Sequence, residues 1–493
     1  MSEFDNPYSF LAANAERIGD ELAIASVEQE ITWSELQFEV DRISAKLRFL
    51  GVKPGQIVTL LGENINLWKL QLAIMKLAAV PAVISMAEVP PYLADELLIT
   101  DRAVKTNARN VVVADEAWLK DAKERFKPVA VEAGYSPEDP IRLVMTSGTT
   151  GTPKAVVISY AAFKIRTNTT QLYWDVPMPE FSMMGFSAAI GFWTALRSLT
   201  NGSVFISITG SARKMASLIE KYQVRTVWAS PAQIATEANY WKENDERLKS
   251  IDRIILTGAS TNHLLITNLK KKVNARLINR FGSSEAGAIS QREFVDENDD
   301  EKWIGPINEG SAVRIVDENN IEVPVGEVGS LQTKSPVMFS GYWKNEAETK
   351  KRLVDGWFVT GDLAYIAPGG RVTLSARDSE IINAGGVKVD PDRVDITLAA
   401  HPIVVDCGTF QLNRKNGQVL IVTMAILREK GKLKELADYL KARLGAYRSK
   451  MIFPVDKIPR NANGKLDRVA LAKMYSTKVD DYMSAQEAKR GLS

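Results

Sequence analysis

Short apolar runs alternate along most of the chain with stretches whose apolar residues recur every three or four positions. The short runs are rich in Val and Ile and are typical of buried β-strands, whereas the longer spacing is typical of helices that pack on one face. We predict a helix around residues 69–80 that runs into a strand, and further strands in QIVTLLGE, NVVVAD, RLVMTS, VRTVWAS, RIILTGAS and ARLINRFGSS. This alternation predicts parallel α/β layers.

The pattern changes from about Ile304 onward. Short strands separated by Gly and Pro turns, as in EVPVGEVGSLQT, predict a β-barrel-like or small antiparallel subdomain. After GGRVTLSARDSEIIN, a compact α+β segment is expected. In that segment, the pair Asn416–Gly417 between two apolar runs predicts a β-hairpin.

The chain has 493 residues, which is too many for one hydrophobic core. We place the boundary between two domains near Arg377 and Asp378, where the two patterns meet. The fold class expected is α/β, with a large N-terminal domain over residues 1–376 that contains the β-barrel-like subdomain. Residues 377–493 are expected to form a small, mobile α+β domain.

Composition and charge narrow the class of protein. Hydrophobic residues make up 45% of the chain and charged residues 25%, as in an ordinary globular protein, so extensive disorder is not expected. The formal net charge is +2, and Lys and Arg form no long block. We therefore expect no nucleic-acid partner.

The chain shows features of a cytoplasmic protein. Its single cysteine, Cys407, excludes an intrachain disulfide framework and fits a reducing compartment. The N-terminal sequence MSEFDNPYSF lacks the basic start and apolar centre of a secretory signal. The most apolar stretch is interrupted by Lys69, Lys76 and Pro81, so no membrane span is expected.

A loop rich in glycine and hydroxyl residues follows one predicted strand, in the sequence VMTSGTTGTPK over residues 144–154. Such a loop offers backbone N–H groups and hydroxyls that can wrap an oligophosphate, and Lys154 adds a positive charge. The common P-loop pattern is excluded because no Ser or Thr follows that lysine. On composition alone, a flexible surface turn is the more common explanation of such a loop.

The order of residues favours the phosphate-binding interpretation. TSGTTGTPKAVVIS resembles the signature loop of the adenylate-forming, or AMP-binding, enzymes: acyl-CoA synthetases, peptide-synthetase adenylation domains and luciferases. The other motifs of that superfamily follow in its order, covering nearly the whole chain: FGSSEAG (Phe281–Gly287), GWFVTGDL (Gly356–Leu363), ARDSEIINAGGVKVDP (Ala376–Pro391) and IPRNANGKLDR (Ile458–Arg468).

The resemblance implies a ligase with two half-reactions. In this superfamily, a carboxylate attacks the α-phosphate of ATP to give an acyl-adenylate and pyrophosphate, and a thiol then displaces AMP to give a thioester. The implied cofactors are ATP, Mg²⁺ and either coenzyme A or the pantetheine arm of a carrier protein. The chemistry mainly needs positioning and neutralisation of phosphate charge.

The resemblance also implies roles for single residues. Ser284 would contact the α-phosphate, and Glu285 would bind Mg²⁺. Asp362 would accept hydrogen bonds from the ribose hydroxyls, with Arg377 as a second ribose contact. The residues expected to hold the rest of the nucleotide are Thr146, Ser147, Gly148, Thr149, Thr150, Gly151 and Lys154 at the phosphates, and Phe281, Gly258 and Ala259 at the adenine.

The second domain would contribute to both half-reactions. Lys465 resembles the lysine that bridges the α-phosphate and the substrate carboxylate, and with Ser284 and Glu285 it completes the implied catalytic set. Asp378 would be the hinge about which the domain rotates. Gly385 and Gly386 would then let the chain lie close to the incoming thiol.

The acyl pocket implied by the resemblance contains Phe186, Ala188, Ala189, Phe192 and Gly282. Aligned in two ways, this segment has alanines where acyl-CoA synthetases have a histidine or where peptide-synthetase domains have an aspartate. Without a carboxylate, an ammonium group would be buried unpaired at high cost. We therefore expect an apolar or aromatic carboxylic acid as substrate.

Three alternatives remain open. The first is an adenylation enzyme that loads a separate carrier protein, since only about two dozen residues follow the last motif, too few for an attached carrier domain. The second is luciferase-like oxidation after adenylation. The third, a binding protein that lacks catalysis, is disfavoured by the presence of Glu285, Asp362 and Lys465.

Overall fold

The computed structural model describes residues 6–489 with internal gaps. The gaps are 63–64, 85–87, 132–133, 147–152, 173–177, 187, 208–214, 239, 260, 262, 296–301, 378–381, 385–386, 400, 414–418, 430, 446–447, 450 and 461–465. The backbone alone is described at 168–172, 232, 236, 264, 376–377, 383–384, 387–388 and 486–489.

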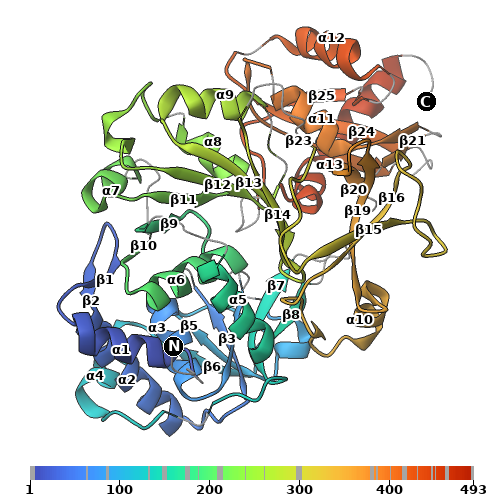
Figure 1. Cartoon of the computed structure of the whole chain (residues 1–493). Helices are drawn as coiled ribbons and strands as arrows, with labels where there is room; N and C mark the ends of the chain where they lie inside the picture. Colours follow the sequence, from blue (N-terminus) through green and yellow to red (C-terminus); the bar gives the residue numbers. More distant parts are fainter. Residues whose placement is uncertain are drawn as a thin grey trace.

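Two large sheets lie in the part of the chain before residue 343 (Figure 1). In the described part of the chain, one has eight strands in the order β14-β13-β12-β11-β9-β10-β1-β2, with parallel pairing from β13 to β1 and antiparallel edges. Its strands are β1 (Leu22–Ala25), β2 (Glu30–Thr32), β9 (Glu180–Ser182), β10 (Phe205–Ser207), β11 (Thr226–Ala229), β12 (Arg253–Thr257), β13 (Arg276–Ser283) and β14 (Gly287–Glu293).

The other sheet has seven described strands in the order β17-β8-β7-β4-β3-β5-β6. Pairing is parallel from β7 to β6 and antiparallel at β8 and β17. Its strands are β3 (Ile57–Leu61), β4 (Val80–Ile84), β5 (Leu97–Thr100), β6 (Asn110–Val113), β7 (Pro140–Thr146), β8 (Lys154–Ser159) and β17 (Gly341–Tyr342). The predicted parallel layers are therefore confirmed.

Helices fill the space between the sheets and cover their outer faces. The largest core cluster contains residues from both sheets and from α1 (Tyr8–Ile18), α2 (Trp33–Phe49), α3 (Ile65–Lys76) and α6 (Ala189–Asn201). A second core lies between the eight-stranded sheet and α7 (Met215–Tyr222), α8 (Pro231–Ala238) and α9 (His263–Lys272). The remaining elements of this region are α4 (Glu116–Arg125), α5 (Tyr160–Leu172) and the 3₁₀ turns η1 (Pro91–Leu93) and η3 (Glu246–Leu248).

Helix α3 lies deep in this core although it carries two lysines. The side chain of Lys69 lies 2.6 Å from Glu39, and that of Lys76 lies 2.7 Å from Asp41; both lysines are at most 5% exposed. Each ammonium group therefore lies beside a different carboxylate, and Glu39 pairs with Lys123 as well. No described helix is both long and apolar enough to cross a membrane.

The segment after β14 forms an antiparallel sheet, as its Gly and Pro turns predict. Its described strand order is β15-β16-β19-β18, and β20 pairs with β19. The elements are β15 (Ala312–Val316), β16 (Gly329–Lys334), β18 (Leu353–Val354), β19 (Trp357–Ala367) and β20 (Arg371–Arg377), with helix α10 (Glu346–Arg352) beside them.

The last part of the chain, orange to red in Figure 1, is an α+β unit with cores of its own. Strands β23 and β24 form the antiparallel hairpin expected on either side of Asn416–Gly417, although the turn itself lies outside the described residues. The elements are β21 (Ile382–Ala384), β22 (Val387–Val389), α11 (Pro391–Ala399), β23 (Val404–Asn413), β24 (Val419–Leu427), α12 (Leu433–Leu444), β25 (Met451–Pro454) and α13 (Arg468–Lys489).

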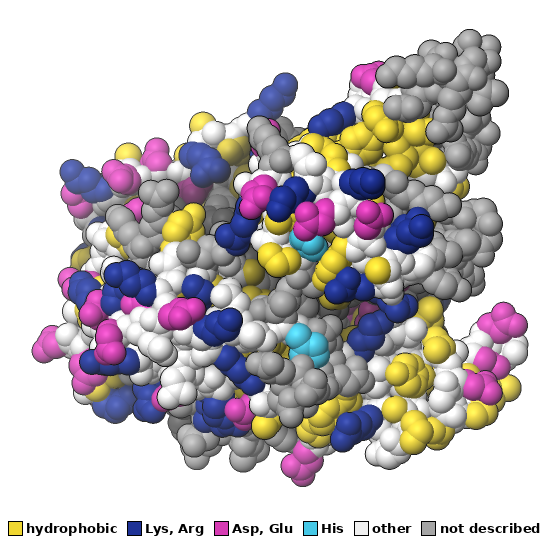
Figure 2. Space-filling model, turned by 90° about the horizontal axis from the view of Figure 1, so that it is seen from above, with side chains coloured by type: hydrophobic (Ala, Val, Ile, Leu, Met, Phe, Trp, Pro, Cys, Tyr) yellow, Lys and Arg dark blue, Asp and Glu magenta, His cyan; other side chains and the backbone are white. Residues whose placement is uncertain are grey.

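Charged side chains of both signs are mixed over the surface. On the face shown in Figure 2, described Lys and Arg side chains lie among Asp and Glu side chains, in keeping with the net charge of +2. Such a mixed surface does not produce one extended field of a single sign.

Candidate active site

A cavity of about 200 Å³ lies where several strand ends meet helices α5 and α6. It receives Thr257 and Gly258 from the end of β12 and Gly282 and Ser283 from the end of β13. The carboxyl ends of neighbouring parallel strands share one edge of a sheet, which is where ligands bind in such folds. The hydroxyl of Thr257 donates to the carbonyl of Arg280 at 3.0 Å and ties the two strand ends together.

The cavity brings together residues predicted for two different ligands. Ala188, Ala189 and Gly282, predicted for the acyl pocket, line the same space as Gly258 and Ser284, predicted for the nucleotide. An acid and a nucleotide held there would be adjacent, as the transfer of an adenylyl group requires.

The hairpin between β13 and β14 shapes the floor of the cavity. The pairing of the two strands shifts register between Phe281 and Gly282. A Cβ atom at Gly282 would lie 2.1 Å from the carbonyl oxygen of Gly287, so only glycine permits this approach. Gly287 has φ +73°, a left-handed conformation that glycine adopts at low cost. The glycines of FGSSEAG are therefore required by the backbone.

Glu285 is held in a defined position in the turn of that hairpin. The hydroxyl of Tyr342 donates to its Oε1 at 2.9 Å, and the backbone N–H of Phe339 donates to its carbonyl at 2.7 Å. Burial, with the nearby Glu285 charge, raises the pKa of Tyr342 well above its usual value, so its hydroxyl keeps its proton and stays a donor.

Arg166 of α5 supports the same turn by donating hydrogen bonds to backbone carbonyls. Its guanidinium donates to the carbonyl of Val337 at 2.6 and 3.0 Å and to that of Ser284 at 3.2 Å. Burial lowers the pKa of Arg166 to about 10, an effect that the charge of Glu285 opposes. The guanidinium therefore remains charged at neutral pH and fixes the backbone beside Ser284 and Glu285.

One segment, residues 335–343, joins the two large sheets next to these residues. It contacts the β13–β14 hairpin through the Ser335 hydroxyl, which donates to the Ala286 carbonyl at 2.9 Å, and through Phe339 as described. Its other end pairs with β8, where the N–H of Ser340 donates to the carbonyl of Val157 and that of Trp343 to the carbonyl of Ala155. We call this segment the bridging segment.

Lys154, at the start of β8, is fixed by an acid from α10. Its ammonium group forms an ion pair with Glu348, which also lies 3.2 Å from Arg352, and its side chain is 13% exposed. Burial raises the pKa of Glu348, but the hydrogen bonds from these two cations outweigh that effect and lower it. The residues between Thr146 and Lys154 that complete the predicted phosphate loop, 147–152, lie outside the described residues.

The two residues predicted for the ribose face each other across a strand pair. Asp362 on β19 is paired in register with Arg377 on β20, whose backbone alone is described. The N–H of Asp362 donates to the hydroxyl of Thr360 at 3.0 Å. Neighbouring positions of this kind can offer one acceptor and one donor to the same ligand.

The predicted adenine contacts lie at the edge of the cavity region. Ala259 is exposed just after Gly258, which lines the cavity and has φ +86°. Phe281 is partly buried and packs with Ile307 and Val313. Since side chains alternate along a strand, Phe281 points away from the face shared by Arg280 and Gly282.

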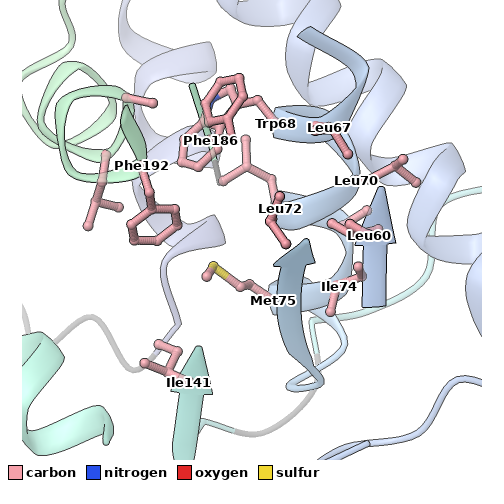
Figure 3. Packing of buried hydrophobic residues seen from close by; sticks show 14 of the residues in the cluster. Leu60, Leu67, Trp68, Leu70, Leu72, Ile74, Met75, Ile141, Phe186 and Phe192 are labelled. Carbon is pink, nitrogen blue, oxygen red and sulfur yellow. The ribbon is translucent and has the colours of Figure 1, made fainter. Parts of the chain in front are cut away.

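Two predicted pocket residues belong to the hydrophobic core instead. Phe186 stacks on Trp68 with ring centroids 5.8 Å apart, and Phe192 meets the same indole edge-on at 5.7 Å (Figure 3). Both phenylalanines are at most 3% exposed. Helical spacing explains the difference, because Ala189, Ile190 and Trp193 lie on the cavity face of α6 and Phe192 on the opposite face.

Several lining residues are not among the predicted site residues. Trp193 and Trp228 give the cavity aromatic walls, and Arg166, Arg197 and Arg280 give it charge. Of these residues, Arg280 was the easiest to suspect from the sequence, because it directly precedes Phe281, the first residue of the motif FGSSEAG. Asp378, Gly385, Gly386 and Lys465, predicted for the hinge, the thiol and catalysis, lie outside the described residues.

Residues 11–343 match the AMP-binding enzyme family, which is more than half of the chain. The chain belongs to this family. AMP-binding enzymes related to it include the 4-chlorobenzoate–CoA ligase of an Arthrobacter species, 26% identical over 96% of both chains. The 2-succinylbenzoate–CoA ligase of Bacillus licheniformis is 25% identical over 94% of this chain and 99% of its own.

A solved structure of an AMP-binding enzyme confirms the fold. The O-succinylbenzoate coenzyme A synthetase of Bacillus subtilis, in complex with ATP and a magnesium ion, superposes with a TM-score of 0.79 at 21% identity, covering 93% of this chain and 98% of the other. The architecture is thus a large N-terminal α/β domain followed by a small C-terminal α+β domain. The chain is an enzyme of the ATP-dependent, AMP-forming acid–thiol ligase family.

Proposed function

We propose that the protein activates an apolar or aromatic carboxylic acid with ATP and transfers the acyl group to the thiol of coenzyme A. In the first step, an oxygen of the acid attacks the α-phosphorus and the bond to pyrophosphate breaks. In the second, the thiol sulfur attacks the acyl carbon and AMP leaves. The observation that carries this proposal is the single cavity lined by both Ala188–Ala189 and Ser284.

Glu285 fits the part of a magnesium ligand. Mg²⁺ prefers oxygen ligands and is commonly held by one or two carboxylates together with substrate phosphates and water. Glu285 supplies one carboxylate that Tyr342 already orients. The described residues contain no cluster of three His, Cys, Asp or Glu side chains that could form a cage without phosphates. When bound, the ion would neutralise phosphate charge next to Ser284.

The character of the cavity walls supports the proposed class of acid. The lining residues include several large or small apolar side chains: Met184, Ala188, Ala189, Ile190, Trp193 and Trp228. The only carboxylate among the described lining residues is that of the exposed Glu309, while three lining residues are arginines. An α-ammonium group would be repelled there, so α-amino acids should be poor substrates.

We propose the remaining roles as the sequence predicts them. Residues 1–376 would bind the acid and the nucleotide, and residues 377–493 would rotate about Asp378 between the half-reactions. Lys465 would serve adenylation, and Gly385 and Gly386 would face the thiol. We expect coenzyme A as the acceptor, because the related 4-chlorobenzoate and 2-succinylbenzoate ligases are named as CoA ligases. The location proposed from the sequence is the cytoplasm.

The experiment is a pyrophosphate-release screen across carboxylic acids, followed by thioester assays with coenzyme A and with a holo-carrier protein. Lys465→Ala should nearly abolish adenylate formation and spare thioester formation from a supplied acyl-adenylate. Equal loss in both half-reactions would refute that role. Transfer to the carrier protein alone would replace coenzyme A by the alternative acceptor, and light emission would indicate luciferase-like chemistry.

A further inference from the structure

Helix α10 connects the two parts of the site proposed for ATP. Before it, the bridging segment carries Tyr342, whose hydroxyl donates to Glu285 near the proposed phosphates. After it, β18 pairs with β19, the strand that carries Asp362, proposed for the ribose. The side chain of Asn345 caps the helix by accepting from the backbone N–H of Glu348 at 3.1 Å. The cap fixes the first turn of the helix, and Glu348 with it.

Glu348 binds two cations, one from each part of this site. Its Oε1 accepts from the ammonium group of Lys154 on β8 and, at 3.2 Å, from Nε of Arg352, one turn along the same helix. Nη1 of Arg352 donates to the carbonyl of Val359 on β19 at 3.2 Å. One carboxylate thus links the cation predicted for the phosphates to the strand predicted for the ribose.

Lys154 also lies near the carboxylate proposed for magnesium. Its ammonium nitrogen is 5.4 Å from the ring centroid of Tyr342, and the hydroxyl of the same tyrosine donates to Oε1 of Glu285 at 2.9 Å. Phosphate groups held at Glu285 would therefore come close to Lys154 across one tyrosine ring. The ammonium group of a lysine can turn from one anion to another by rotating the bonds of its flexible four-carbon side chain.

We propose that Glu348 is a positioning residue that holds Lys154 until ATP binds and then releases it to the phosphates. This inference rests on the proposed function, in which Lys154 contacts the phosphates. In the exchange, the ion pair between Lys154 and Glu348 breaks, Lys154 pairs with a phosphate oxygen, and Glu348 stays paired with Arg352. When pyrophosphate leaves, Lys154 returns to Glu348. No covalent bond changes and no proton moves.

The balance of charge explains why the exchange can run in both directions. The side chains of Lys154 and Glu348 are 13% and 19% exposed. Separating a pair so far from water is costly when one charge is left alone. Arg352 removes that cost for Glu348, because its planar guanidinium already contacts the carboxylate and can bind both of its oxygens. The phosphates remove it for Lys154, so each charge keeps an opposite charge in both states.

The exchange predicts opposite effects for the two partners of Lys154 release. Glu348→Gln removes the anion that competes with the phosphates, so the enzyme should bind ATP about tenfold more tightly. Arg352→Gln removes the cation that keeps Glu348 paired after release, so ATP should bind about tenfold more weakly. The affinity for pyrophosphate should shift in the same two directions. A purely structural role for this ion-pair cluster would weaken binding in both variants.

The measured quantities are the dissociation constants of ATP and of pyrophosphate, by isothermal titration calorimetry on the full-length enzyme with Mg²⁺ and without acid. Glu346→Gln is the matched control, since it removes an exposed carboxylate from the same helix, and it should leave both constants unchanged. The double variant Glu348→Gln with Arg352→Gln should bind ATP as tightly as Glu348→Gln, because the competing anion is absent from both. Melting curves show which variants fold.

The outcomes separate this inference from the proposed function. Shifts in the same direction in both single variants, or no shift in Glu348→Gln, would overturn the exchange and leave the proposed function standing. No pyrophosphate release with any acid would contradict the proposed function, whereas the ATP titrations would still decide the exchange. If Arg352→Gln does not fold, Arg352→Lys decides: it keeps a charge without the planar fork and should weaken ATP binding to a smaller extent. Tighter binding in that variant would overturn the exchange.

Discussion

The core around α3 and the wall of the cavity both bury cations, but they balance them differently. In the core, Lys69 and Lys76 each lie beside a separate carboxylate, Glu39 and Asp41. At the cavity, Glu180 lies 3.0 Å from Arg197 and also attracts the charge of Arg280. A charge in a packed core must form an ion pair within the protein. A charge that lines a cavity can also pair with a bound ligand.

The comparison also explains why each set of residues lies where it does. The lysines of α3 extend from a helix that is buried on all sides, so no ligand can reach them and the protein must supply the anions itself. The arginines extend from three different elements into a common space. A small anion can enter that space and contact them. The following changes test this contrast, from the largest expected effect to the smallest.

Lys76→Met should lower the free energy of unfolding by about 3–5 kcal/mol, because it leaves Asp41 largely buried without its cation. The measurement is the urea midpoint of the variant against the wild type. Adding Asp41→Leu should recover most of the loss, since an apolar pair removes the uncompensated charge. The specific activity of the folded fraction should stay unchanged. A loss below about 1 kcal/mol would show that water reaches Asp41.

Glu180→Gln should cost about 2–3 kcal/mol in unfolding free energy, because Arg197 loses a fully buried charged partner. Glu293→Gln, which removes the exposed partner of Arg276, is the control and should change stability by less than about 1 kcal/mol. A loss no larger than that of Glu293→Gln would show that the buried pair of Glu180 and Arg197 adds nothing to stability.

Tyr342→Phe removes the hydroxyl that donates to Glu285 in the described part of the chain. Adenylation should slow about tenfold, or about 1.4 kcal/mol, and the Mg²⁺ concentration for half-maximal rate should rise. The control is Tyr135→Phe, whose hydroxyl donates to the carbonyls of Met75 and Ala79 in the core. It should affect stability but not the Mg²⁺ dependence. An unchanged Mg²⁺ dependence in Tyr342→Phe would separate Glu285 from the ion.

Glu237 is a buried acid that is stabilised by keeping its proton and not by an ion pair. Burial raises its pKa from 4.5 to about 7. Below pH 4.5 the group is protonated in the folded and unfolded states alike. As the pH rises toward and through 7, the unfolded state ionises more readily, so stability is lost. Glu237→Gln should reduce the decline of the unfolding free energy between pH 5 and 8 by about 1–2 kcal/mol, as measured by urea unfolding at each pH. Parallel curves would refute this.

Much of the fold could be predicted because its signals are local. The apolar runs that predicted β3, β6, β7, β11, β12 and β13 correspond to strands in the structure. The helix and strand expected after Lys69 are α3 and β4. Motif order predicted that Ala188, Gly258 and Ser284 belong to one enzyme site, and the cavity brings these residues together.

The part of the site that could not be predicted depends on contacts between residues far apart in the chain. Nothing in the sequence near Glu180 shows that it meets Arg197 and Trp228, because the pairing arises only when β9, α6 and β11 pack. Residues 187–193, SAAIGFW, are almost all apolar, so their composition does not show which side chains face the cavity. That choice follows from where α6 starts, at Ala189, and it places Phe192 in the core.

The bridging segment has a consequence for how the enzyme is made on the ribosome. Strands β1 to β14 hold the pairings of both large sheets, apart from β17, before residue 335 is synthesised. Yet the contacts that tie Glu285 to β8 come from Phe339, Ser340 and Trp343, more than fifty residues later than Glu285 itself. A nascent chain that has already folded its sheets therefore lacks a fixed Glu285, and it gains one only when the bridging segment has left the exit tunnel.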